Sequence, residues 1–556
     1  MTIESTIAGL VEAVSARVPE RPAIIHGHRQ LTYTELVDRT RRLARYLADR
    51  GLGCHRERDG LAGHEMGQDR LAQCLYNGPE YLEGLLGSYR ARVSPFNVNY
   101  RYVVDEMRYL LRDAQPRAIQ YHAGFGPLLA EVLDGLDIES PEVLLQVDDG
   151  SGQPLLPGAV DYEQALASVP ARIDTEPSPD DIYLLYTGGT TGMPKGVLWR
   201  QADALVALLG VRNRRTGQQW ESLEEKLAAT PKRPLRVMPL APYMHGAAQW
   251  GALQALVDGN TVVIPDQVQR FDPSDVLATI AAKEVAVVTL VGDAFGRPLA
   301  DALEADPRDL PSLKVLLSGG AALNAVHKER LIAGVPGLTI TETIGSSETG
   351  VQGRMLGLAA GRPMFAREAS ALVISEDMTK VLEPGHEGTG WLATRGRVPL
   401  GYLGDEEKTA RTFPVVEGER VSVPGDRARL LVGDIVEMLG RDSVTINTGG
   451  EKVFAEEVEE AVKAHADVAD AMVCGRPSER WGAEVVALVQ RRPGVELSSE
   501  DLVAFCAGRM ARFKLPKTVI FVESVQRSAS GKADYRWASA TAAGQSTAPD
   551  RRVGST

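Results

Sequence analysis

The chain has 556 residues, of which 44% are hydrophobic and 24% charged, a composition typical of ordinary globular proteins. Collagen-like, low-complexity and wholly disordered classes are therefore excluded, and the length corresponds to roughly three or four domain-sized units of about 150 residues. With 61 basic and 74 acidic residues the net charge is -13, which disfavours sequence-independent binding to nucleic acid or to an anionic membrane.

Targeting and membrane signals are missing from the sequence pattern. Acidic residues precede the first apolar positions, where a secretory signal would carry basic ones. No apolar run reaches the roughly 18 to 20 residues of a spanning helix, and the last residues form no prenylation box. The 4 cysteines contain no C-x-x-C pair, so they indicate neither a disulfide framework nor a zinc site. We expect a cytoplasmic protein without integral membrane association and without a nucleic-acid partner.

Short apolar or β-branched runs alternate with longer segments of helical period over most of the chain. Residues 33–50 and 102–113 have the apolar stripe of amphipathic helices. Strands are expected at residues 181–186, 260–265, 285–291, 313–317 and 337–340. This alternation predicts an α/β fold whose mixed sheets are packed between helices.

The pattern changes near residue 424. Two strands are expected around a turn at Val432, Gly433 and Asp434. A compact α+β unit follows, with strand 444–447, helix 455–463, strands near Ala471 and Val485, helix 499–510 capped by Ser498 or Ser499, and strand 518–522. We therefore predict a large composite N-terminal domain over residues 1–440, a hinge at 441–443, a small mobile α+β C-terminal domain over 444–537, and a disordered tail over 538–556.

A glycine- and threonine-rich loop follows the strand expected at residues 181–186. Its glycines allow close approach of a ligand, its hydroxyls and N–H groups can surround phosphate oxygens, and Lys195 adds a positive charge. It is not a Walker A loop, because Lys195 lies between Pro194 and Gly196. The pattern favours polyphosphate binding, with a plain surface turn as the alternative that the composition leaves open. The loop residues are Thr187, Gly188, Gly189, Thr190, Thr191, Gly192 and Lys195.

Residues 186–196 resemble the phosphate loop of the adenylate-forming superfamily, which includes acyl-CoA synthetases, peptide-synthetase adenylation domains and firefly-type luciferases. Further motifs of that family follow in order, from about residue 5 to residue 537. The resemblance implies a large domain and a small rotating domain, ATP and Mg²⁺ as cofactors, and activation of a carboxylic acid as acyl-AMP.

Residues 344–348 resemble the family's aromatic-Gly-x-Thr-Glu motif, with Ile344 in the aromatic position before Gly345. The resemblance implies that Ser347 contacts the α-phosphate and that Glu348 binds the metal, in keeping with the preference of Mg²⁺ for carboxylate oxygens. Locally, the same residues could be a helix cap. A hydrolase elbow is excluded because Thr349 replaces its last glycine.

The adenine and ribose positions follow from the same resemblance. Residues 318–322 resemble the family's adenine-side loop, and in the family a ribose-binding Asp lies fifteen positions before an Arg. Counting back from Arg441 selects Asp426, whereas Asp434 is expected to be a turn residue. The predicted adenine and ribose residues are Gly319, Gly320, Ala321, Glu342, Ile344, Gly345, Asp426 and Arg441.

The small domain supplies the remaining motifs of the resemblance. Lys532, in a Ser-Gly-Lys loop, corresponds to the lysine that bridges carboxylate and α-phosphate during adenylation. The hinge is expected at Asp442 and Ser443. The turn expected to line the CoA tunnel comprises Gly449, Gly450, Glu451 and Lys452. In the large domain, His245 corresponds to the gate of the acyl pocket, although a satisfied core histidine is the local alternative.

These motifs together predict an AMP-forming acyl-CoA ligase whose small-molecule partners are a carboxylic acid, ATP and CoA. The residues of these motifs resemble those of actinobacterial fatty-acyl-CoA synthetases that act on bulky or polycyclic acids. Three alternatives stay open: delivery to a carrier protein, a relative that performs one half-reaction, and a nucleotide-binding module without turnover. A homodimer is also left open. Residues 54–69 are longer than the connection expected in this family, and the sequence assigns them no function.

Overall fold

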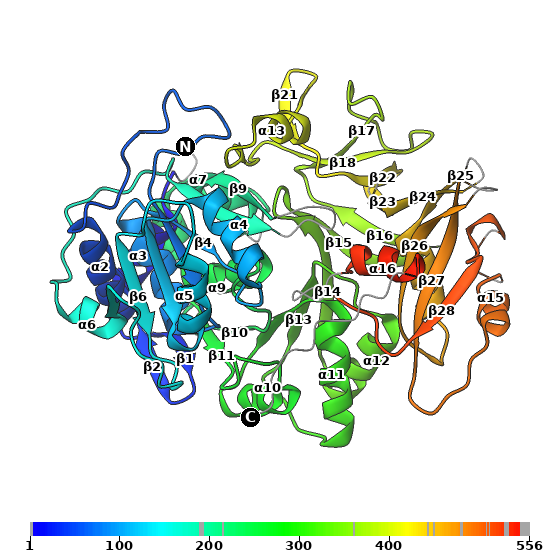
Figure 1. Ribbon diagram of the computed structural model, residues 1–556, viewed down its shortest axis with the longest axis horizontal. Coiled ribbons are helices and arrows are strands. Elements are labelled where there is room, and N and C mark those ends of the chain that lie inside the picture. Colours follow the sequence, from blue (N-terminus) through cyan, green and yellow to red (C-terminus); the bar gives the residue numbers. More distant parts are fainter. Residues whose placement is uncertain are drawn as a thin grey trace. The chain divides into compact units, whose positions relative to one another are not determined.

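The computed structural model describes residues 4–187, 194–213, 216–359, 362–441, 444–448, 451–478, 482–507, 509–510, 512–527 and 533–544 (Figure 1). The chain divides into two compact units. The first comprises Met1–Thr187, Pro194–Val351 and Gly396–Phe413, and the second comprises Gly188–Met193, Gln352–Arg395 and Pro414–Thr556.

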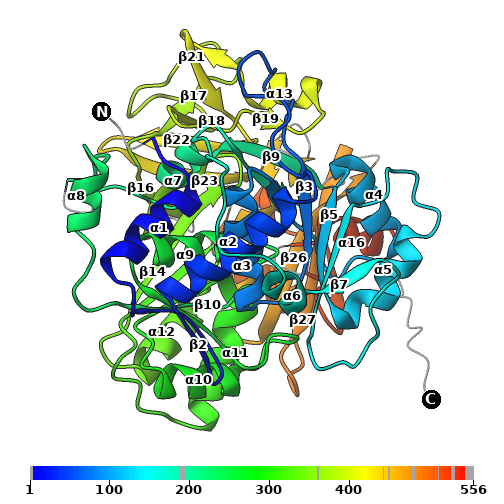
Figure 2. The ribbon, with the colours of Figure 1, turned by 90° about the vertical axis from the view of Figure 1, so that its left-hand side faces the viewer.

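A five-stranded parallel sheet lies in the first unit, in the order β4-β3-β5-β6-β7. Its strands are β3 (Arg70–Cys74), β4 (Ser94–Asn97), β5 (Ala118–His122), β6 (Val143–Val147) and β7 (Ala159–Asp161). Helices cover both faces, as Figure 2 shows. One face carries α2 (Tyr33–Ala48), α3 (Pro79–Arg90) and α6 (Tyr162–Ala167), and the other carries α4 (Val104–Ala114) and α5 (Gly126–Leu133). The short η1 (Ala123–Phe125) directly precedes α5.

A second, larger sheet of this unit runs in the order β2-β1-β11-β10-β12-β13-β14 and is parallel except at the β1–β2 pair. The strands are β1 (Pro22–His26), β2 (Arg29–Thr32), β10 (Arg236–Pro239), β11 (Thr261–Ile264), β12 (Val287–Leu290), β13 (Val315–Gly319) and β14 (Thr339–Ser346). The helices are α1 (Ile7–Arg17), α8 (Leu223–Ala228), α9 (Gly246–Val257), α10 (Pro273–Ala282), α11 (Gly292–Ala305) and α12 (Ala325–Gly334). One hydrophobic core includes residues of both sheets and of α1, α2, α3 and α9.

A small antiparallel sheet of the first unit has the order β19-β9-β8. It consists of β8 (Ile182–Thr187), β9 (Lys195–Arg200) and β19 (Gly401–Tyr402), followed by α7 (Gln201–Ala207) after β9 and α13 (Glu406–Thr412) after β19. Strand β19 is more than two hundred positions after β9 in the sequence, so this sheet brings together distant parts of the chain.

Antiparallel strands form the first half of the second unit. They are β15 (Gly350–Ala359), β16 (Arg362–Arg367), β17 (Ala371–Ile374), β18 (Gly390–Arg395), β20 (Val415–Val416), β21 (Glu419–Ser422), β22 (Asp426–Leu431) and β23 (Ile435–Arg441). The β22–β23 hairpin turns at Val432, Gly433 and Asp434, as predicted, and Asp434 has a positive φ of 60°.

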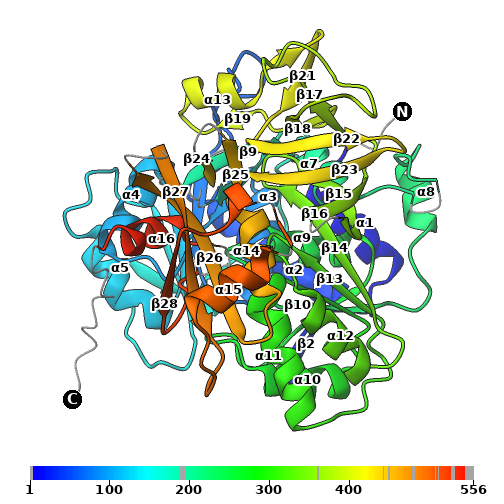
Figure 3. The ribbon, with the colours of Figure 1, turned by 90° about the vertical axis from the view of Figure 1, so that its right-hand side faces the viewer.

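The C-terminal part of the second unit is an α+β fold with its own hydrophobic core (Figure 3). Its strands are β24 (Thr445–Thr448), β25 (Glu451–Phe454), β26 (Val468–Ser478), β27 (Gly482–Arg491) and β28 (Thr518–Val522). Its helices are α14 (Ala455–Lys463), α15 (Ser499–Ala507), the short η3 (Arg512–Lys514) and α16 (Tyr535–Ala542). Ser498 Oγ accepts a hydrogen bond from the Asp501 amide at 3.1 Å, so Ser498 caps α15.

The predicted fold class is confirmed: a mixed α/β fold with several sheets in a large N-terminal part and a small C-terminal domain. The expected disordered tail from residue 538 is wrong for residues 538–542, because α16 continues to Ala542 and buries Ala538 and Ala542. Small side chains that look like a linker in sequence here allow the helix to pack closely. The domain and hinge boundaries at 441–443 stay predictions. No helix in the described ranges is long and apolar enough to cross a membrane.

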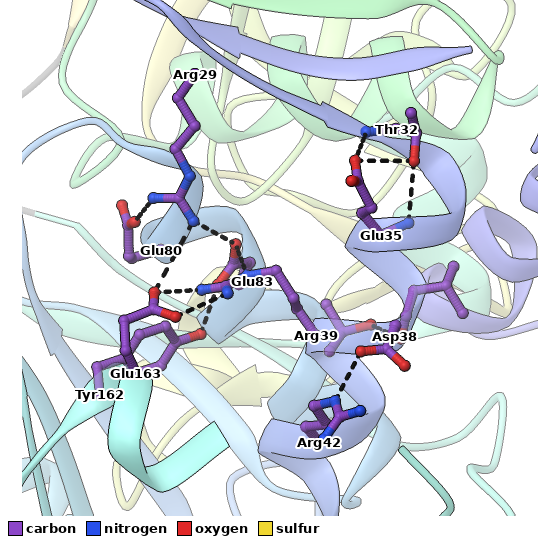
Figure 4. A network of polar contacts seen from close by, with 12 residues as sticks. Arg29, Thr32, Glu35, Asp38, Arg39, Arg42, Glu80, Glu83, Tyr162 and Glu163 are labelled. Atoms are coloured by element: carbon purple, nitrogen blue, oxygen red, sulfur yellow. Dashed lines mark hydrogen bonds and ion pairs between the residues drawn. The ribbon is translucent and has the colours of Figure 1, made fainter. Parts of the chain in front are cut away.

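Helices α2, α3 and α6 are also joined by a network of charges around the buried Glu83 (Figure 4). The Arg39 guanidinium donates to both oxygens of Glu83, at 2.7 and 3.0 Å, and to Glu163 at 2.9 Å. The Tyr162 hydroxyl also donates to Glu83, at 2.8 Å. Because the Glu83 side chain is 0% exposed, burial raises its pKa, and Arg39 opposes that rise.

Candidate active site

The ends of the predicted phosphate loop are fixed by the β8–β9 hairpin. Thr187 and Lys195 are cross-strand partners, so the two ends of the loop lie next to each other. The buried Asn97 fixes the β8 end: its side chain accepts from the Tyr186 amide at 2.9 Å and donates to the Tyr186 carbonyl at 2.8 Å. The loop residues Gly188, Gly189, Thr190, Thr191 and Gly192 lie outside the described residues, so their contact with phosphate stays a prediction.

Lys195 is held between two carboxylates. Its Nζ lies 3.4 Å from Asp405 Oδ2 and 3.9 Å from Asp113 Oδ1. Partial burial lowers the pKa of Lys195, but the neighbouring acidic groups, Asp113 and Asp405 among them, outweigh burial and leave the pKa raised. The side chain therefore remains a cation, positioned at the base of the loop.

The motif at residues 344–348 forms a tight turn between β14 and β15. The Ser346 amide donates to Thr349 Oγ1 at 3.0 Å, and the Glu348 amide donates to Ser346 Oγ at 3.2 Å. Gly345 has no room for a side chain, since a Cβ there would lie 2.0 Å from the Gly350 carbonyl oxygen. The turn is thus anchored by its own hydroxyl groups.

Glu348 and Ser347 are each tied to the small β19-β9-β8 sheet. The Tyr402 hydroxyl donates to Glu348 Oε1 at 2.8 Å, and the indole of the fully buried Trp199 donates to the Ser347 carbonyl at 2.9 Å. The Lys408 ammonium lies 4.2 Å from the centre of the Tyr402 ring. The sheet therefore contains Lys195, the first residue of β9, and contacts Glu348 through Tyr402 of β19.

The fit of a divalent cation depends on the donors at this turn. Glu348 supplies a half-buried carboxylate, and Mg²⁺ in nucleotide sites commonly uses one or two carboxylates with phosphate oxygens and water. No cluster of three or more His, Cys, Asp or Glu side chains suited to a metal exists in the described part of the chain. The residues present thus fit a nucleotide-bound Mg²⁺ better than a metal held by protein ligands alone.

The predicted adenine-side loop follows β13. Gly320 has a positive φ of 82°, and a Cβ on Gly319 would lie 2.9 Å from Thr343 Oγ1. Glu342, in contrast, already has partners in the protein: it is ion-paired with Lys328 and accepts from the Leu323 amide at 3.0 Å. Those contacts give Glu342 a role in fixing α12 to β14, and its contact with adenine stays a prediction. Ala321 and Ile344 are half-buried and Gly345 is exposed at the same end of the sheet.

His245 lies at the N-cap position of α9. Asn97, which fixes the end of β8, also donates to the Met244 carbonyl at 2.7 Å. One buried amide thereby connects the strand before the phosphate loop with the turn that carries His245. Its predicted role as a gate stays a prediction.

In the second unit, Asp426 and Arg441 are cross-strand partners in the β22–β23 hairpin. Asp426 is 7% exposed, whereas Asp434 is an exposed turn residue whose side chain accepts from Arg367 at 2.7 Å. The side chain of Arg441 lies outside the described residues, as do those of Glu451 and Lys452, whose backbone belongs to β25. Other predicted positions outside the described residues are Asp442, Ser443, Gly449, Gly450 and Lys532.

Sequence reasoning missed three residues that contact Lys195 or Glu348, namely Asp113, Tyr402 and Asp405. It also missed Lys408, on the face of the Tyr402 ring, and Asn97, at the end of β8. Asp405 carries a recognisable signal, because an Asp before Glu406 is a typical helix N-cap, and its side chain does accept from the Lys408 amide. Tyr402 carries none: its proximity to Glu348 depends on the pairing of β19 with β9.

The fold and the site define a mixed α/β protein in which one short segment, residues 402–405, contacts both Glu348 and Lys195. The chain matches the family model of AMP-binding enzymes over residues 11–403 and that of the AMP-binding enzyme C-terminal domain over residues 457–532. It therefore belongs to the AMP-binding enzyme family.

Curated relatives match along nearly the whole length. The chain is 50% identical over 543 residues to the medium-chain acyl-CoA ligase Mig of Mycobacterium avium, covering 97% of this chain and 98% of the relative. It is 39% identical over 549 residues to a medium/long-chain-fatty-acid–CoA/3-oxocholest-4-en-26-oate–CoA ligase of Mycobacterium tuberculosis, covering 97% and 96%.

Solved structures share the fold at low sequence identity. The anthranilate CoA ligase AuaEII in complex with anthranoyl-AMP matches with a TM-score of 0.80 at 21% identity, covering 97% of this chain and 98% of that one. ATP-bound MatB from Rhodopseudomonas palustris matches with a TM-score of 0.77 at 23% identity, covering 97% and 99%.

Proposed function

We propose that the protein is an ATP-dependent acyl-CoA ligase, an AMP-forming acid–thiol ligase. In the first step a carboxylate oxygen of the acid bonds to the α-phosphorus of ATP, the bond to the bridging oxygen breaks, and pyrophosphate leaves. In the second step the CoA sulfur bonds to the acyl carbon, the bond from that carbon to the phosphate oxygen breaks, and AMP leaves while the thiol proton is released. Family membership and the acyl-CoA ligase names of the relatives support this activity.

The observation that carries the proposal is the attachment of Lys195 and Glu348 to one segment of the protein. Tyr402 binds Glu348, and Asp405, three positions later, binds Lys195. ATP and the carboxylate substrate are both anions and repel each other. Fixed cations at the site therefore lower the barrier to adenylation by electrostatic stabilisation. Lys195 supplies one such charge at the base of the glycine-threonine loop.

Magnesium is part of the proposal, with Glu348 as its ligand from the protein. The ion supplies neutralisation of phosphate charge when bound to ATP. Glu348 would hold it beside the turn that Ser346 and Thr349 anchor, and Ser347 would donate to the α-phosphate.

The second unit is proposed to bind the ribose and to supply the reactive lysine. Asp426, opposite Arg441, can accept hydrogen bonds from both ribose hydroxyls because a carboxylate has two acceptor oxygens. Lys532 would bring carboxylate and α-phosphate together, and residues 449–452 would line the path of the CoA thiol.

For the acid we propose a fatty acid of medium chain length or a bulky polycyclic acid, with His245 at the entrance of its pocket. The names of the relatives support this range, since they include a medium-chain acyl-CoA ligase at 50% identity. The relative at 39% identity is named for medium/long-chain fatty acids and 3-oxocholest-4-en-26-oate.

A homodimer also remains a prediction. Analytical ultracentrifugation would measure the oligomeric state.

The test is a panel of carboxylic acids assayed separately for the two steps. Pyrophosphate release is measured without CoA, and thioester formation is measured with CoA, using fatty acids of several lengths, a steroid side-chain acid and a small aromatic acid. We expect both signals with medium-chain or polycyclic acids and weaker ones with the small acid. Thioester that forms only on a phosphopantetheinyl carrier protein, or activity in only one of the two steps, would contradict the proposal. ATP binding without pyrophosphate release from any acid would instead favour a binding module.

A further inference from the structure

Tyr402 is the link between the predicted metal ligand and the core of the first unit. Its hydroxyl donates to Glu348 Oε1 at 2.8 Å, although the two residues are 54 positions apart. Tyr402 is 3% exposed, and Glu348 is half-buried. A charge-assisted bond of this kind is roughly twice as strong as a neutral one.

The Tyr402 ring itself has little freedom. Its strand, β19, pairs with β9 next to Val197, and its amide donates to Thr409 Oγ1 at 2.9 Å. The rings of Tyr402 and Phe413 are 5.6 Å apart. Lys408 lies on the ring face. The hydroxyl therefore points to Glu348 from a fixed position.

Residues 54–69, which had no assigned function, support the same strand. The segment closes on itself through a bridge between Cys54 and Gln68. At its far end the His64 carbonyl accepts from the Gly404 amide at 2.9 Å. Gly63 lies so close to the Leu400 carbonyl that a Cβ would be 2.4 Å from its oxygen. The long connection thus buttresses the residues on both sides of Tyr402.

We propose that Tyr402 is a positioning residue, supported by the 54–69 segment, that orients the Glu348 carboxylate toward a nucleotide-bound divalent cation. This inference rests on the proposed function, since it takes Glu348 to be the metal ligand. An ionised carboxylate has about four acceptor sites, more than a single phenol hydroxyl can occupy. Partners that orient a metal ligand typically change metal affinity by about 10- to 100-fold when removed.

A phenol suits this task because its hydroxyl donates a hydrogen bond while carrying no charge. The group therefore orients the carboxylate without adding a positive charge that would compete with the cation. A lysine in the same position would hold Glu348 in a salt bridge and weaken its attraction for the metal.

The test compares Tyr402→Phe with wild-type protein, using Mn²⁺ as the probe. Mn²⁺ is titrated by electron paramagnetic resonance in the presence of α,β-methylene-ATP, which blocks adenylation. We expect Tyr402→Phe to bind Mn²⁺ about 10-fold more weakly, while its affinity for the nucleotide in EDTA changes by less than about twofold. The matched control is Tyr121→Phe, which removes a buried hydroxyl that donates to Gln146 at 2.9 Å, and we expect it to bind Mn²⁺ like the wild type.

An unchanged Mn²⁺ affinity in Tyr402→Phe would overturn the positioning role. The positioning role would also be overturned if Tyr402→Ala bound Mn²⁺ weakly and Tyr402→Phe bound it like the wild type. The ring of Tyr402, and not its hydroxyl, would then be what Mn²⁺ binding requires. Failure of the proposed function looks different: wild-type protein would bind Mn²⁺ and nucleotide but release no pyrophosphate with any acid. In that case a weaker Mn²⁺ affinity in Tyr402→Phe would still support the positioning role.

Discussion

Two aspartates of one hairpin show how environment decides the role of a residue. Asp426 is 7% exposed and lies opposite Arg441, whereas Asp434 is in the turn and bonds to Arg367 on the surface. We expect Asp426→Ala to weaken ATP binding by about 10- to 100-fold, the size expected when hydrogen bonds to a charged group are lost. Isothermal titration with ATP measures this effect.

Asp434→Ala serves as the matched control, because it removes the same side chain from the same hairpin. We expect it to change ATP affinity by less than about twofold, since exposed ion pairs contribute little. A larger loss in Asp434→Ala than in Asp426→Ala would overturn the assignment of the ribose to Asp426.

The sequence could identify Asp426 only through family spacing. A regular hairpin with this turn would place Asp426 opposite Gly440, because Leu431 pairs with Ile435 and each step moves one residue along both strands. A bulge between Arg427 and Ala428 shifts the register by one and brings Asp426 opposite Arg441. Residue patterns do not reveal such a bulge, which depends on local backbone geometry.

At the scale of elements, the sequence predicted best where apolar residues recur with helical period or form a short continuous run. The ranges of α14 and β28 agree with those predicted, 455–463 and 518–522. Strand β14 was predicted only to residue 340 but continues to Ser346, because its polar Thr and Glu residues hide the strand pattern. The pairing of β19 with β9 places Tyr402 in the candidate site. It depends on contacts between segments far apart in the sequence, so no local sequence pattern predicts it.

The contact between the 54–69 segment and β19 gives a prediction for Gly63. In Gly63→Ala the new Cβ would meet the Leu400 carbonyl oxygen at 2.4 Å, so one backbone must move. We expect a loss of about 1 to 3 kcal/mol in the free energy of unfolding and a weaker Mn²⁺ affinity in the same direction as Tyr402→Phe. Denaturant unfolding and the Mn²⁺ titration measure the two effects.

Gly53→Ala is the control for this variant. Gly53 precedes the same segment, and a Cβ added there would lie at an ordinary 3.5 Å from its nearest neighbour, the Ala91 carbonyl oxygen. We expect little change in stability or Mn²⁺ affinity. Equal behaviour of the two alanine variants would show that the contact with Leu400 does not support the site.

The charge network of α2, α3 and α6, with the buried Glu83 in it, gives a second prediction at this scale (Figure 4). Arg39→Met would leave the Glu83 carboxylate, which is 0% exposed, without its bidentate partner. Breaking a buried pair from one side costs about 3 to 5 kcal/mol. We expect that loss near pH 8, measured by denaturant unfolding. Arg42→Met, which removes a partly exposed partner of Asp38, is expected to cost about 1 kcal/mol or less.

The sign of the pH dependence follows from Glu83. Burial already raises its pKa in the folded protein, and removing Arg39 removes the main opposing effect. Because the pKa of Glu83 is higher in the folded protein than the value of about 4.3 in the unfolded chain, its protonation stabilises the folded state below about pH 4.3. That stabilisation is lost as the pH rises through the pKa of Glu83 in the folded protein. The deficit of Arg39→Met relative to wild type is therefore expected to shrink as the pH falls toward about 5. A deficit that grew in acid would contradict this account.

At the scale of the whole molecule, a chain of net charge -13 is proposed to capture ATP and CoA, which are themselves polyanions. The overall field opposes such ligands, so their binding must depend on local groups. Lys195, held between carboxylates in the first unit, and Glu348 with its proposed cation are two of these groups. Sequence motifs identified both, but the carboxylates and the phenol that position them became visible only in the folded chain.

Lys532 provides the prediction that separates the two half-reactions of the whole enzyme. If it bridges carboxylate and α-phosphate only during adenylation, Lys532→Ala will lose at least about 100-fold in acyl-AMP formation, because its charge acts on the attacking and leaving groups. Thioester formation from supplied acyl-AMP and CoA is expected to change by less than about threefold. The exposed Lys380 provides a control, since Lys380→Ala alters the net charge equally and is expected to leave both steps intact. An equal loss of both steps in Lys532→Ala would mean that one arrangement of the small domain serves both reactions, and would contradict a mechanism in which the domain rotates between them.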